Sequence, residues 1–178
     1  MLKLLLTGRP RCGKSSLLQK NLTGLTLRGF AMQRLTRGGE TWAFRLLDLA
    51  EEPYVTHLES EENWDDIAIS LLAPGKWQGN TQVFENKGCR ALEKSLQATG
   101  IVVLDELGIF ESKAVNFQRA VFRLLDSKLP VLGVLKDKHT PFLDQVRAHP
   151  AVEIAHFPCP EAIAMVEALT ARLRGQRQ

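Results

Sequence analysis

Residues 8–15 read Gly-Arg-Pro-Arg-Cys-Gly-Lys-Ser and fit the pattern G-x-x-x-x-G-K-[ST] of a phosphate-binding loop, or P-loop. Gly8 and Gly13 let the backbone bend so that successive N–H groups point inward and can hold the oxygens of a polyphosphate. The Lys14 side chain can reach the β- and γ-phosphates, and the Ser15 hydroxyl can ligate Mg²⁺. This stretch predicts a nucleotide-binding site with Mg²⁺ as its cofactor.

The segments on either side of this loop match the context that a true P-loop requires. Residues 2–7 form a short apolar run of strand length, and residues 15–22 carry apolar side chains at helical spacing. A helix that begins at the loop directs the positive end of its dipole toward a bound anion. The sequence therefore predicts a strand, a P-loop and a helix in succession.

The other residues of the loop leave two questions open. Pro10 has no N–H group and contributes only its shape. Arg9 and Arg11 either strengthen the attraction for phosphate or lie in solvent, and the sequence does not decide between the two. Cys12, beside both arginines, is either an easily oxidised thiol or simply a small loop residue.

A second chemical stretch lies at residues 101–106, where four apolar residues end in Asp105 and Glu106. Such a run is typical of a buried parallel strand, and ligands of open α/β sheets bind at the carboxyl ends of the strands. We expect Asp105 to hold the hydration shell of Mg²⁺, the role of a Walker B acid, so that Ser15 and (through water) Asp105 form the metal site. Glu106 is expected to polarise the attacking water, which makes Glu106 and Lys14 the predicted catalytic residues. The alternative is that the acidic pair merely ends a strand.

The composition limits the classes of protein to which the chain can belong. Its 178 residues are enough for one sizeable core, which predicts a single domain over residues 1–178. The formal net charge of +3 is too small to indicate nucleic acid, and the three cysteines form no C-x-x-C pair that would suggest zinc or a disulfide framework. We see no membrane span or signal peptide. We expect a cytoplasmic protein that is a monomer or a small homo-oligomer.

The rest of the chain alternates between apolar runs and helical patterns. Strands are expected at residues 27–35 and 41–49 as a β-hairpin, and at 54–58, 81–84, 101–106, 130–135 and 152–155. Helices are expected at 85–99, at 114–127 with Val115, Val121, Phe122 and Leu125 inward, at 141–148, and from Pro160 with Ile163, Val166, Ala168 and Leu169 inward. Residues 59–66 and 74–80 are expected as loops, and 67–72 are ambiguous. This order predicts an α/β fold with a mostly parallel central sheet between helices, plus an inserted β-hairpin.

With both motifs placed, the chain resembles a family of P-loop NTPases: the nucleoside-triphosphate phosphatases first described from thermophiles, also called cancer-related nucleoside-triphosphatases. The P-loop resembles the family's G-x-P-G-x-G-K-T-T. Residues 103–111 resemble its I-D-E-I-G-K-M-E, with Gly108 and Glu111 at the same offsets from the Asp-Glu pair. Residues 27–44 resemble its early hairpin, and residues 75–85 resemble a G-K/R-Y…F-E stretch. The resemblance covers most of the chain.

This resemblance implies a recombinase-type core and Mg²⁺-dependent hydrolysis of several nucleoside triphosphates to diphosphate and phosphate. The residues expected to bind the nucleotide are Gly8, Arg9, Pro10, Arg11, Cys12, Gly13, Lys14, Ser15, Ser16, Asp105, Glu106 and Gly108. The chain departs from the family pattern at Arg11, where the family has Gly, at Ile109, where it has Lys, and at residues 156–161, which lack its Asn-Arg pair. These departures leave open whether base recognition, oligomer contacts or the rate of turnover differ.

Two other functions remain open. A small nucleotide or nucleoside kinase would need an acceptor site and usually an arginine-rich lid, and no compact lid of that kind is visible after residue 120. The other alternative is a nucleotide-dependent binding module that needs a partner for turnover. Candidate cations for the γ-phosphate are Lys113, Arg119, Lys136, Lys138 and Arg147. Trp77 either stacks on a base or packs within the hairpin.

Overall fold

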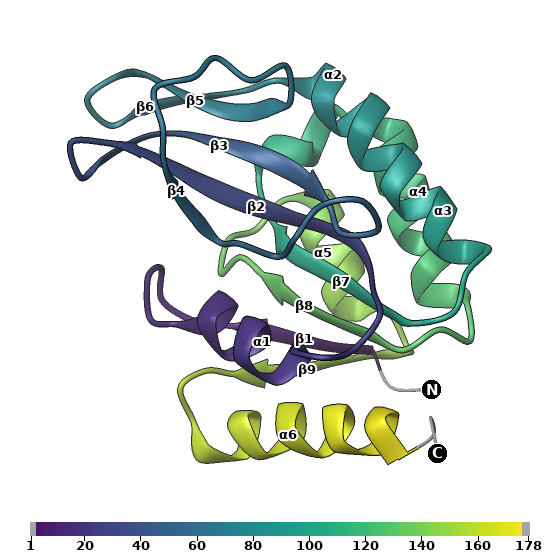
Figure 1. Ribbon diagram of the computed structural model, residues 1–178. Coiled ribbons are helices and arrows are strands. Elements are labelled where there is room, and N and C mark those ends of the chain that lie inside the picture. The colour runs from purple at the N-terminus through teal and green to yellow at the C-terminus, as the bar shows by residue number, and fades with distance from the viewer. Residues whose placement is uncertain (1–2, 176–178) are drawn as a thin grey trace.

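The computed structural model describes residues 3–175, in which a mixed β-sheet is flanked by helices on both faces (Figure 1). The strands are β1 (Lys3–Thr7), β2 (Leu27–Arg37), β3 (Glu40–Asp48), β4 (His57–Glu59), β5 (Ile67–Ala73), β6 (Lys76–Gly79), β7 (Ile101–Leu107), β8 (Val131–Leu135) and β9 (Val152–His156). The helices are α1 (Lys14–Leu22), α2 (Thr81–Val83), the π-helical η1 (Phe84–Gly88), α3 (Cys89–Leu96), the 3₁₀ turn η2 (Phe110–Lys113), α4 (Val115–Asp126), α5 (Pro141–Ala148) and α6 (Pro160–Gly175).

The parallel half of the sheet has the order β7-β8-β1-β9, so β1 lies between two parallel neighbours. Leu4, Leu5 and Leu6 of β1 are fully buried, as expected for a strand that is covered on both faces. Leu4 and Leu6 face one layer of helices, and Leu5 faces the other. The carboxyl ends of β1, β7 and β8 therefore meet at one edge of the sheet. The predicted Leu2 of this strand lies outside the described residues.

The other half of the sheet is antiparallel and has the order β2-β3-β5-β6. β2 joins the two halves, because residues 27–31 pair in parallel with β7 while residues 30–37 pair with β3. Gly29 has a φ of +86°, and a Cβ on it would lie 2.1 Å from the carbonyl oxygen of Val103. Only glycine therefore allows β2 to approach β7 at this point.

Two hydrophobic layers hold the helices on the sheet. On one face Phe30, Phe84 and Phe117 pack edge to face, with ring centroids 5.3 and 5.5 Å apart. On the other face Leu18 of α1 and Val166 of α6 are buried against the sheet, and Figure 1 shows these two helices together below it. Burying one such side chain contributes roughly 1.5–3 kcal/mol to the free energy of unfolding. The two layers therefore hold the helices, and the loops that join them to the strands, in place on the sheet. No helix of residues 3–175 combines the length and the apolar character that crossing a bilayer requires.

The structure corrects the prediction for residues 81–84, which are helical instead of extended. The side chain of Asn80 accepts a hydrogen bond from the N–H of Gln82 at 3.1 Å and so caps the start of α2. The helical path then continues through η1 and α3, as far as Leu96. The predicted loop at residues 74–80 contains β6, which pairs with β5.

Two residues that were predicted to face the core are exposed. Val115 begins α4 and is 51% exposed, because the buried stripe of that helix starts at Phe117. Ala168 lies on the outer side of α6, where the inward positions are Ala162, Val166, Leu169 and Thr170. The two helices were therefore predicted correctly, but the prediction of which residues on them face the core was partly wrong.

Candidate active site

The P-loop connects β1 to α1 at the carboxyl edge of the sheet. Gly8 and Gly13 have φ values of 145° and 101°, which produce the bends that the motif predicted. Arg11 also has a positive φ, of 57°, which the motif did not predict. A Cβ on Gly8 would lie 2.4 Å from the carbonyl oxygen of Phe157, in the segment after β9, so this position requires glycine. α1 begins at Lys14, one residue earlier than predicted.

Lys14 lies almost fully buried against the P-loop, with 6% of its surface exposed. Its ammonium donates hydrogen bonds to the carbonyl oxygens of Gly8 and Arg9, at 3.1 and 2.7 Å, and lies 3.6 Å from the sulfur of Cys12. A buried ammonium needs partners, and here the loop's own carbonyls provide them. A polyphosphate in the loop would offer charged oxygens instead, which bind an ammonium more strongly.

Ser15 and Asp105 meet between α1 and the end of β7. The Ser15 hydroxyl donates to Oδ1 of Asp105 at 2.9 Å, although 90 residues separate them in the chain. Burial raises the pKa of Asp105 to about 6, and hydrogen bonds from Tyr54 and Ser15 oppose that effect. Among residues 3–175 no group of three or more His, Cys, Asp or Glu side chains could hold a metal ion. A hydroxyl and one carboxylate nevertheless fit Mg²⁺, which usually takes its other ligands from water and substrate phosphates.

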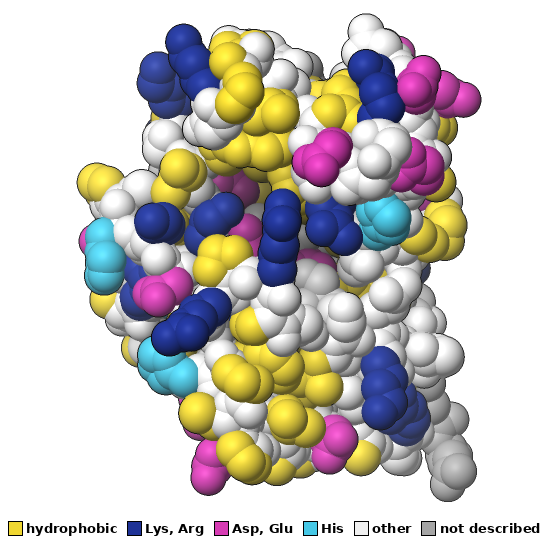
Figure 2. All heavy atoms as spheres, turned by 90° about the vertical axis from the view of Figure 1, so that its left-hand side faces the viewer, with side chains coloured by type: hydrophobic (Ala, Val, Ile, Leu, Met, Phe, Trp, Pro, Cys, Tyr) yellow, Lys and Arg dark blue, Asp and Glu magenta, His cyan; other side chains and the backbone are white. Residues whose placement is uncertain are grey.

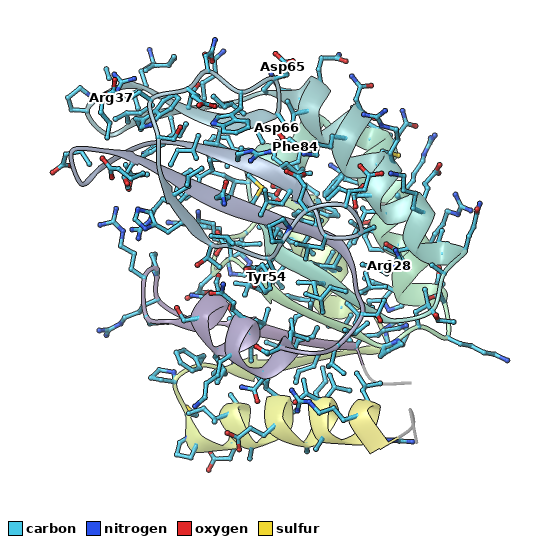
Figure 3. The ribbon with its side chains drawn as sticks, viewed as in Figure 1. Arg28, Arg37, Tyr54, Asp65, Asp66 and Phe84 are labelled. Carbon is cyan, nitrogen blue, oxygen red and sulfur yellow. The ribbon has the colours of Figure 1, made fainter. Side chains whose placement is uncertain are left out.

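Tyr54 is a site residue that the sequence did not reveal. It lies between β3 and β4, and its hydroxyl donates to Oδ2 of Asp105 at 2.5 Å. Gln19 of α1 donates to the carbonyl oxygen of Tyr54 at 2.7 Å, which ties this segment to the helix that follows the P-loop (Figure 3). Each oxygen of Asp105 thus accepts from a different hydroxyl, and the carboxyl group is fixed in orientation. The 51 residues between Tyr54 and Asp105 explain why no sequence signal linked them.

Glu106 lies next to Asp105 in β7, and one-third of its side chain is exposed. Lys136 is the first residue after β8, and its ammonium lies 3.3 Å from Oε1 of Glu106, which makes an ion pair. β8 pairs with β7 and with β1, so Lys136 follows the strand that lies between Glu106 and the P-loop strand. Glu106 therefore has the exposure that access of water requires, together with a cationic partner.

A buried carboxyl lies behind this ion pair. Glu111 in η2 is 2% exposed and accepts a hydrogen bond from the N–H of Gly108 at 3.1 Å. Burial raises the pKa of Glu111 to about 7. Gly108, which was predicted to contact the nucleotide, is itself buried and its N–H is bonded to Glu111, so it does not present a donor at the surface.

Replacing Glu111 with glutamine should flatten the dependence of stability on pH. A raised pKa means that the folded chain binds this proton more tightly than the unfolded chain, so the free energy of unfolding falls as the pH rises from 4.5, the ordinary pKa, to about 7. The part due to Glu111 is about 3 kcal/mol, and glutamine has no proton to lose in this range. Urea denaturation of both proteins at about pH 4 and about pH 8 measures this difference in the free energy of unfolding. The contribution of Asp105 to the pH dependence is common to both proteins and cancels in the comparison. Equal pH dependence in the two proteins would contradict the assignment.

The exposed face around the P-loop carries many basic side chains. Figure 2 shows Lys and Arg side chains gathered across the middle of the side of the molecule that lies at the left in Figure 1, around a hollow in which acidic side chains are visible. Arg9, Pro10, Arg11 and Ser16 are exposed, and Cys12 is partly buried. Both arginines therefore lie in solvent, and whether they also strengthen the attraction for phosphate stays a prediction.

Of the five candidate cations, Lys136 is the one that the structure brings to Glu106. Arg147 instead donates to the carbonyl oxygens of Lys136 and Lys138, at 2.8 and 2.6 Å, and forms an ion pair with Asp144 at 2.9 Å. Lys138 is exposed, as are Lys113 and Arg119. Lys136 is therefore the cation at the candidate site, whereas Arg147 stabilises the loop after β8.

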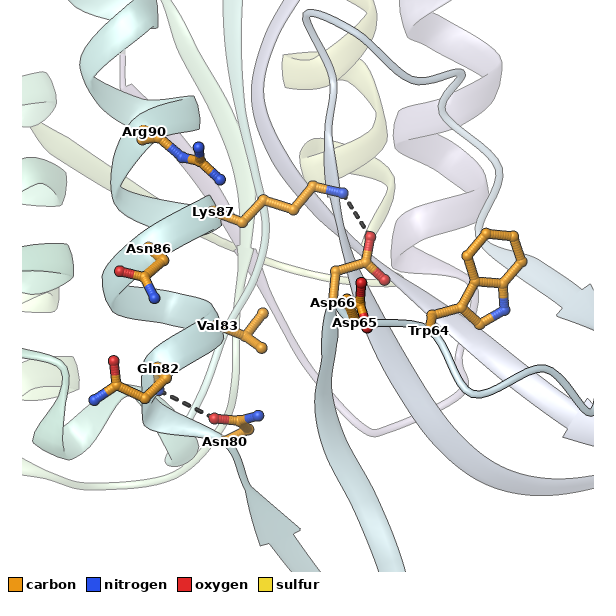
Figure 4. Close-up of a pocket in the computed structure, with 9 residues that line it drawn as sticks. All are labelled: Trp64, Asp65, Asp66, Asn80, Gln82, Val83, Asn86, Lys87 and Arg90. Atoms are coloured by element: carbon orange, nitrogen blue, oxygen red, sulfur yellow. Dashed lines mark hydrogen bonds and ion pairs between the residues drawn. The ribbon is translucent and has the colours of Figure 1, made fainter.

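A cavity of about 490 Å³ lies elsewhere, between the segment before β5 and the helices α2 and η1 (Figure 4). Its lining includes Trp64, Asp65 and Asp66, and Lys87 forms an ion pair with Asp66 across it at 2.6 Å. In Figure 3, Asp65 and Asp66 lie near the top of the molecule, well apart from Tyr54. No predicted site residue lines this cavity, so it is separate from the candidate active site.

Trp77 lies in β6 and packs against Phe44 of β3, with ring centroids 5.6 Å apart. This contact is the hairpin packing that is one of the two roles the sequence allows for Trp77. β6 is the end strand of the antiparallel half, whereas the P-loop follows β1 in the parallel half. The structure thus supports a packing role for Trp77.

Relatives of known name match most of the chain. The protein named nucleoside-triphosphatase THEP1 from Thermotoga sp. (strain RQ2) is 27% identical over 151 residues, which cover 82% of this chain and 80% of the relative. The protein of the same name from Methanocaldococcus jannaschii is 26% identical over 141 residues, which cover 75% of this chain and 78% of the relative. These matches confirm the resemblance that the motifs indicated.

Solved structures share the fold. The crystal structure of THEP1 from Aquifex aeolicus matches with a TM-score of 0.71 at 20% identity, over 97% of this chain and 99% of that one. The solution structure of a human cancer-related nucleoside triphosphatase matches with a TM-score of 0.68 at 18% identity, over the full length of both chains. Both confirm an α/β fold with a mostly parallel sheet between helices. Because the model of the family described as NTPase matches residues 3–158, the chain belongs to that family.

Proposed function

We propose that this chain binds nucleoside triphosphates at the carboxyl edge of its sheet and, with Mg²⁺, hydrolyses them to nucleoside diphosphate and phosphate. The proposal rests on one observation: Lys14, the Ser15–Asp105 pair and Glu106 come together at that edge from segments about 90 residues apart. Membership of the NTPase family and the names of the relatives support hydrolysis instead of transfer to an acceptor.

Glu106 is placed to orient a water molecule toward the γ-phosphate. The water oxygen forms a bond to the γ-phosphorus, and the bond from that phosphorus to the bridging oxygen breaks, with its electron pair leaving on the diphosphate. The Glu106 carboxylate accepts the proton that the water gives up. Lys14 neutralises the charge that gathers on the bridging and γ-oxygens, so positioning and electrostatics supply the acceleration.

Mg²⁺ would be held by the Ser15 hydroxyl and, through water, by Asp105. When bound, it neutralises charge on the β- and γ-phosphate oxygens. Ser15 and Tyr54 each hold one oxygen of Asp105, so the carboxylate is already oriented before any metal binds.

Replacing Asp105 with asparagine should raise the Mg²⁺ concentration required for half-maximal activity by about 10–100-fold. The amide keeps an oxygen that can accept from Ser15, but it loses the charge that attracts the metal. Nucleotide affinity measured without Mg²⁺ should change little. Titration of activity with Mg²⁺ in both proteins measures the effect, and an unchanged Mg²⁺ requirement would mean that Asp105 only ends a strand.

The proposed function is tested with a panel of nucleoside triphosphates, with and without Mg²⁺, by following diphosphate, monophosphate and transfer products. We expect the purified chain alone to release diphosphate and phosphate in equal amounts, and only with Mg²⁺. Little discrimination among bases is expected, because the strong sequence signals address phosphates and metal. Preference for one base by about a thousandfold would indicate an undetected polar base pocket. Transfer to an added nucleoside or nucleotide, or release that needs a partner, would contradict the proposal.

A further inference from the structure

Lys136 occupies a position at the sheet edge that connects the two halves of the proposed site. It follows β8, which pairs with β7 on one side and with β1 on the other. β7 carries Glu106, and β1 leads into the P-loop. A cation at the end of β8 therefore lies next to the proposed base, on the strand between that base and the strand that leads into the P-loop.

The main chain of Lys136 is fixed while its ammonium is not. The N–H of Lys136 donates to the carbonyl oxygen of Leu107 at 2.9 Å, and its own carbonyl oxygen accepts from Arg147 at 2.8 Å. The side-chain stem runs past Gly108, where a Cβ would lie 3.6 Å from its Cδ atom. At the end of this stem the ammonium pairs with Glu106, and both side chains of the pair are about one-third exposed. Such an exposed pair is weak, so exchanging one partner for another costs little.

A triphosphate would change the balance at this pair. The γ-phosphate carries more negative charge than one carboxylate, so it attracts the Lys136 ammonium more strongly than Glu106 does. Lys14 is directed into the loop by its bonds to Gly8 and Arg9, which leaves Lys136 as the cation beside Glu106. A diphosphate ends one phosphate short and offers no such competitor.

We propose that Lys136 exchanges its ion pair with Glu106 for one with the γ-phosphate, and that this exchange frees Glu106 to accept the proton of water only when a triphosphate is bound. The inference rests on the proposed function and extends it by making Lys136 a catalytic residue that also discriminates triphosphates from diphosphates. Lys136 stabilises the charge of the transferring phosphoryl group once it has moved.

The test compares Lys136→Met with wild type in two measurements on the same preparation. One is the affinity, in the presence of Mg²⁺, for a non-hydrolysable triphosphate analogue and for the corresponding diphosphate. The other is single-turnover hydrolysis. We expect the affinity for the analogue to fall by about tenfold, the affinity for the diphosphate to stay unchanged, and hydrolysis to fall by about a hundredfold or more. Lys136→Arg should recover part of both losses, because the charge returns.

Lys128→Met is the matched control, because Lys128 is an exposed lysine just before the opposite end of the same strand. It should leave both measurements at the wild-type value. Adding Lys136→Met to Glu106→Gln should cost much less hydrolysis than it costs in wild type, since both residues act on the same step.

Three results would overturn the inference: unchanged triphosphate selectivity in Lys136→Met, an equal loss of diphosphate affinity, or fully additive losses in the double variant. If Lys136→Met fails to fold, Lys136→Gln replaces it, because its amide keeps hydrogen bonding without charge. The affinity measurement remains decisive even if the wild-type chain releases no phosphate. Failure of the proposed function and failure of this inference are therefore distinguishable.

Discussion

Replacing Lys14 with alanine should lower single-turnover hydrolysis by about a thousandfold or more, the scale at which a cation acts on a transferring phosphoryl group. The loop backbone itself fixes this ammonium, through the carbonyl oxygens of Gly8 and Arg9. Alanine removes the charge that is expected to meet the β- and γ-phosphates. Triphosphate affinity should fall as well, because this contact is also made before the reaction begins.

Lys20→Ala is the control, since Lys20 is an exposed lysine in the last turn of the same helix. It removes the same charge without touching the loop and should leave hydrolysis unchanged. Lys14→Met retains most of the buried stem and so separates loss of packing from loss of charge. Circular dichroism verifies that each variant is folded. Near-normal hydrolysis by both Lys14 variants would remove the P-loop assignment.

Glu106→Gln should lower hydrolysis by about a hundredfold or more while nucleotide binding survives. The amide keeps the shape of the carboxylate but loses the charge that is proposed to polarise water. Lys14, Ser15 and Asp105 remain, so the groups proposed to hold the triphosphate and the metal are intact. A fall in kcat without weaker binding is the result expected when an interaction exists only in the transition state.

Glu153→Gln provides a matched control for this variant, because Glu153 is an exposed acid on β9. Nucleotide affinity and single-turnover hydrolysis are measured on the same preparation of each variant. Full hydrolysis by Glu106→Gln would refute the catalytic role. Loss of nucleotide binding would instead show that Glu106 is structural.

The parts of the site that could be predicted from the sequence are those that lie within one short stretch. The P-loop carries its own geometry, since Gly8 and Gly13 must bend wherever the loop is placed. The run before Asp105 and Glu106 likewise identifies a buried strand and its end. Features of this kind depend only on residues that are close in sequence, so they can be predicted without knowing which strands are neighbours in the sheet.

The parts that could not be predicted depend on which strands lie side by side. Lys136 reaches Glu106 because β8 pairs with β7, and four other cations had equal claims in the sequence. Tyr54 reaches Asp105 because the segment after β3 folds back over the edge, held by Gln19. No fixed sequence separation identifies either contact, because the tertiary packing of distant segments brings the two residues together.

The wrong element at residues 81–84 has a different cause. Thr81, Val83 and Phe84 suit a strand as well as the first turn of a helix, and the cap at Asn80 favours the helix. Val115 was wrongly predicted to be buried because it lies in the first turn of α4, where side chains are often exposed even when they are apolar.

The position of β1 has a consequence for how the molecule opens and closes. This strand has a neighbour on each side and a layer of helices on each face, so we expect its amide protons to be among the slowest in the described chain to exchange with solvent. The loop that is proposed to bind phosphate thus follows directly from a strand that is buried and paired on both sides. Because β1 is held in this way, we expect the motions that admit a nucleotide and release its products to occur in the short segments beyond the strand ends, while the sheet itself stays rigid.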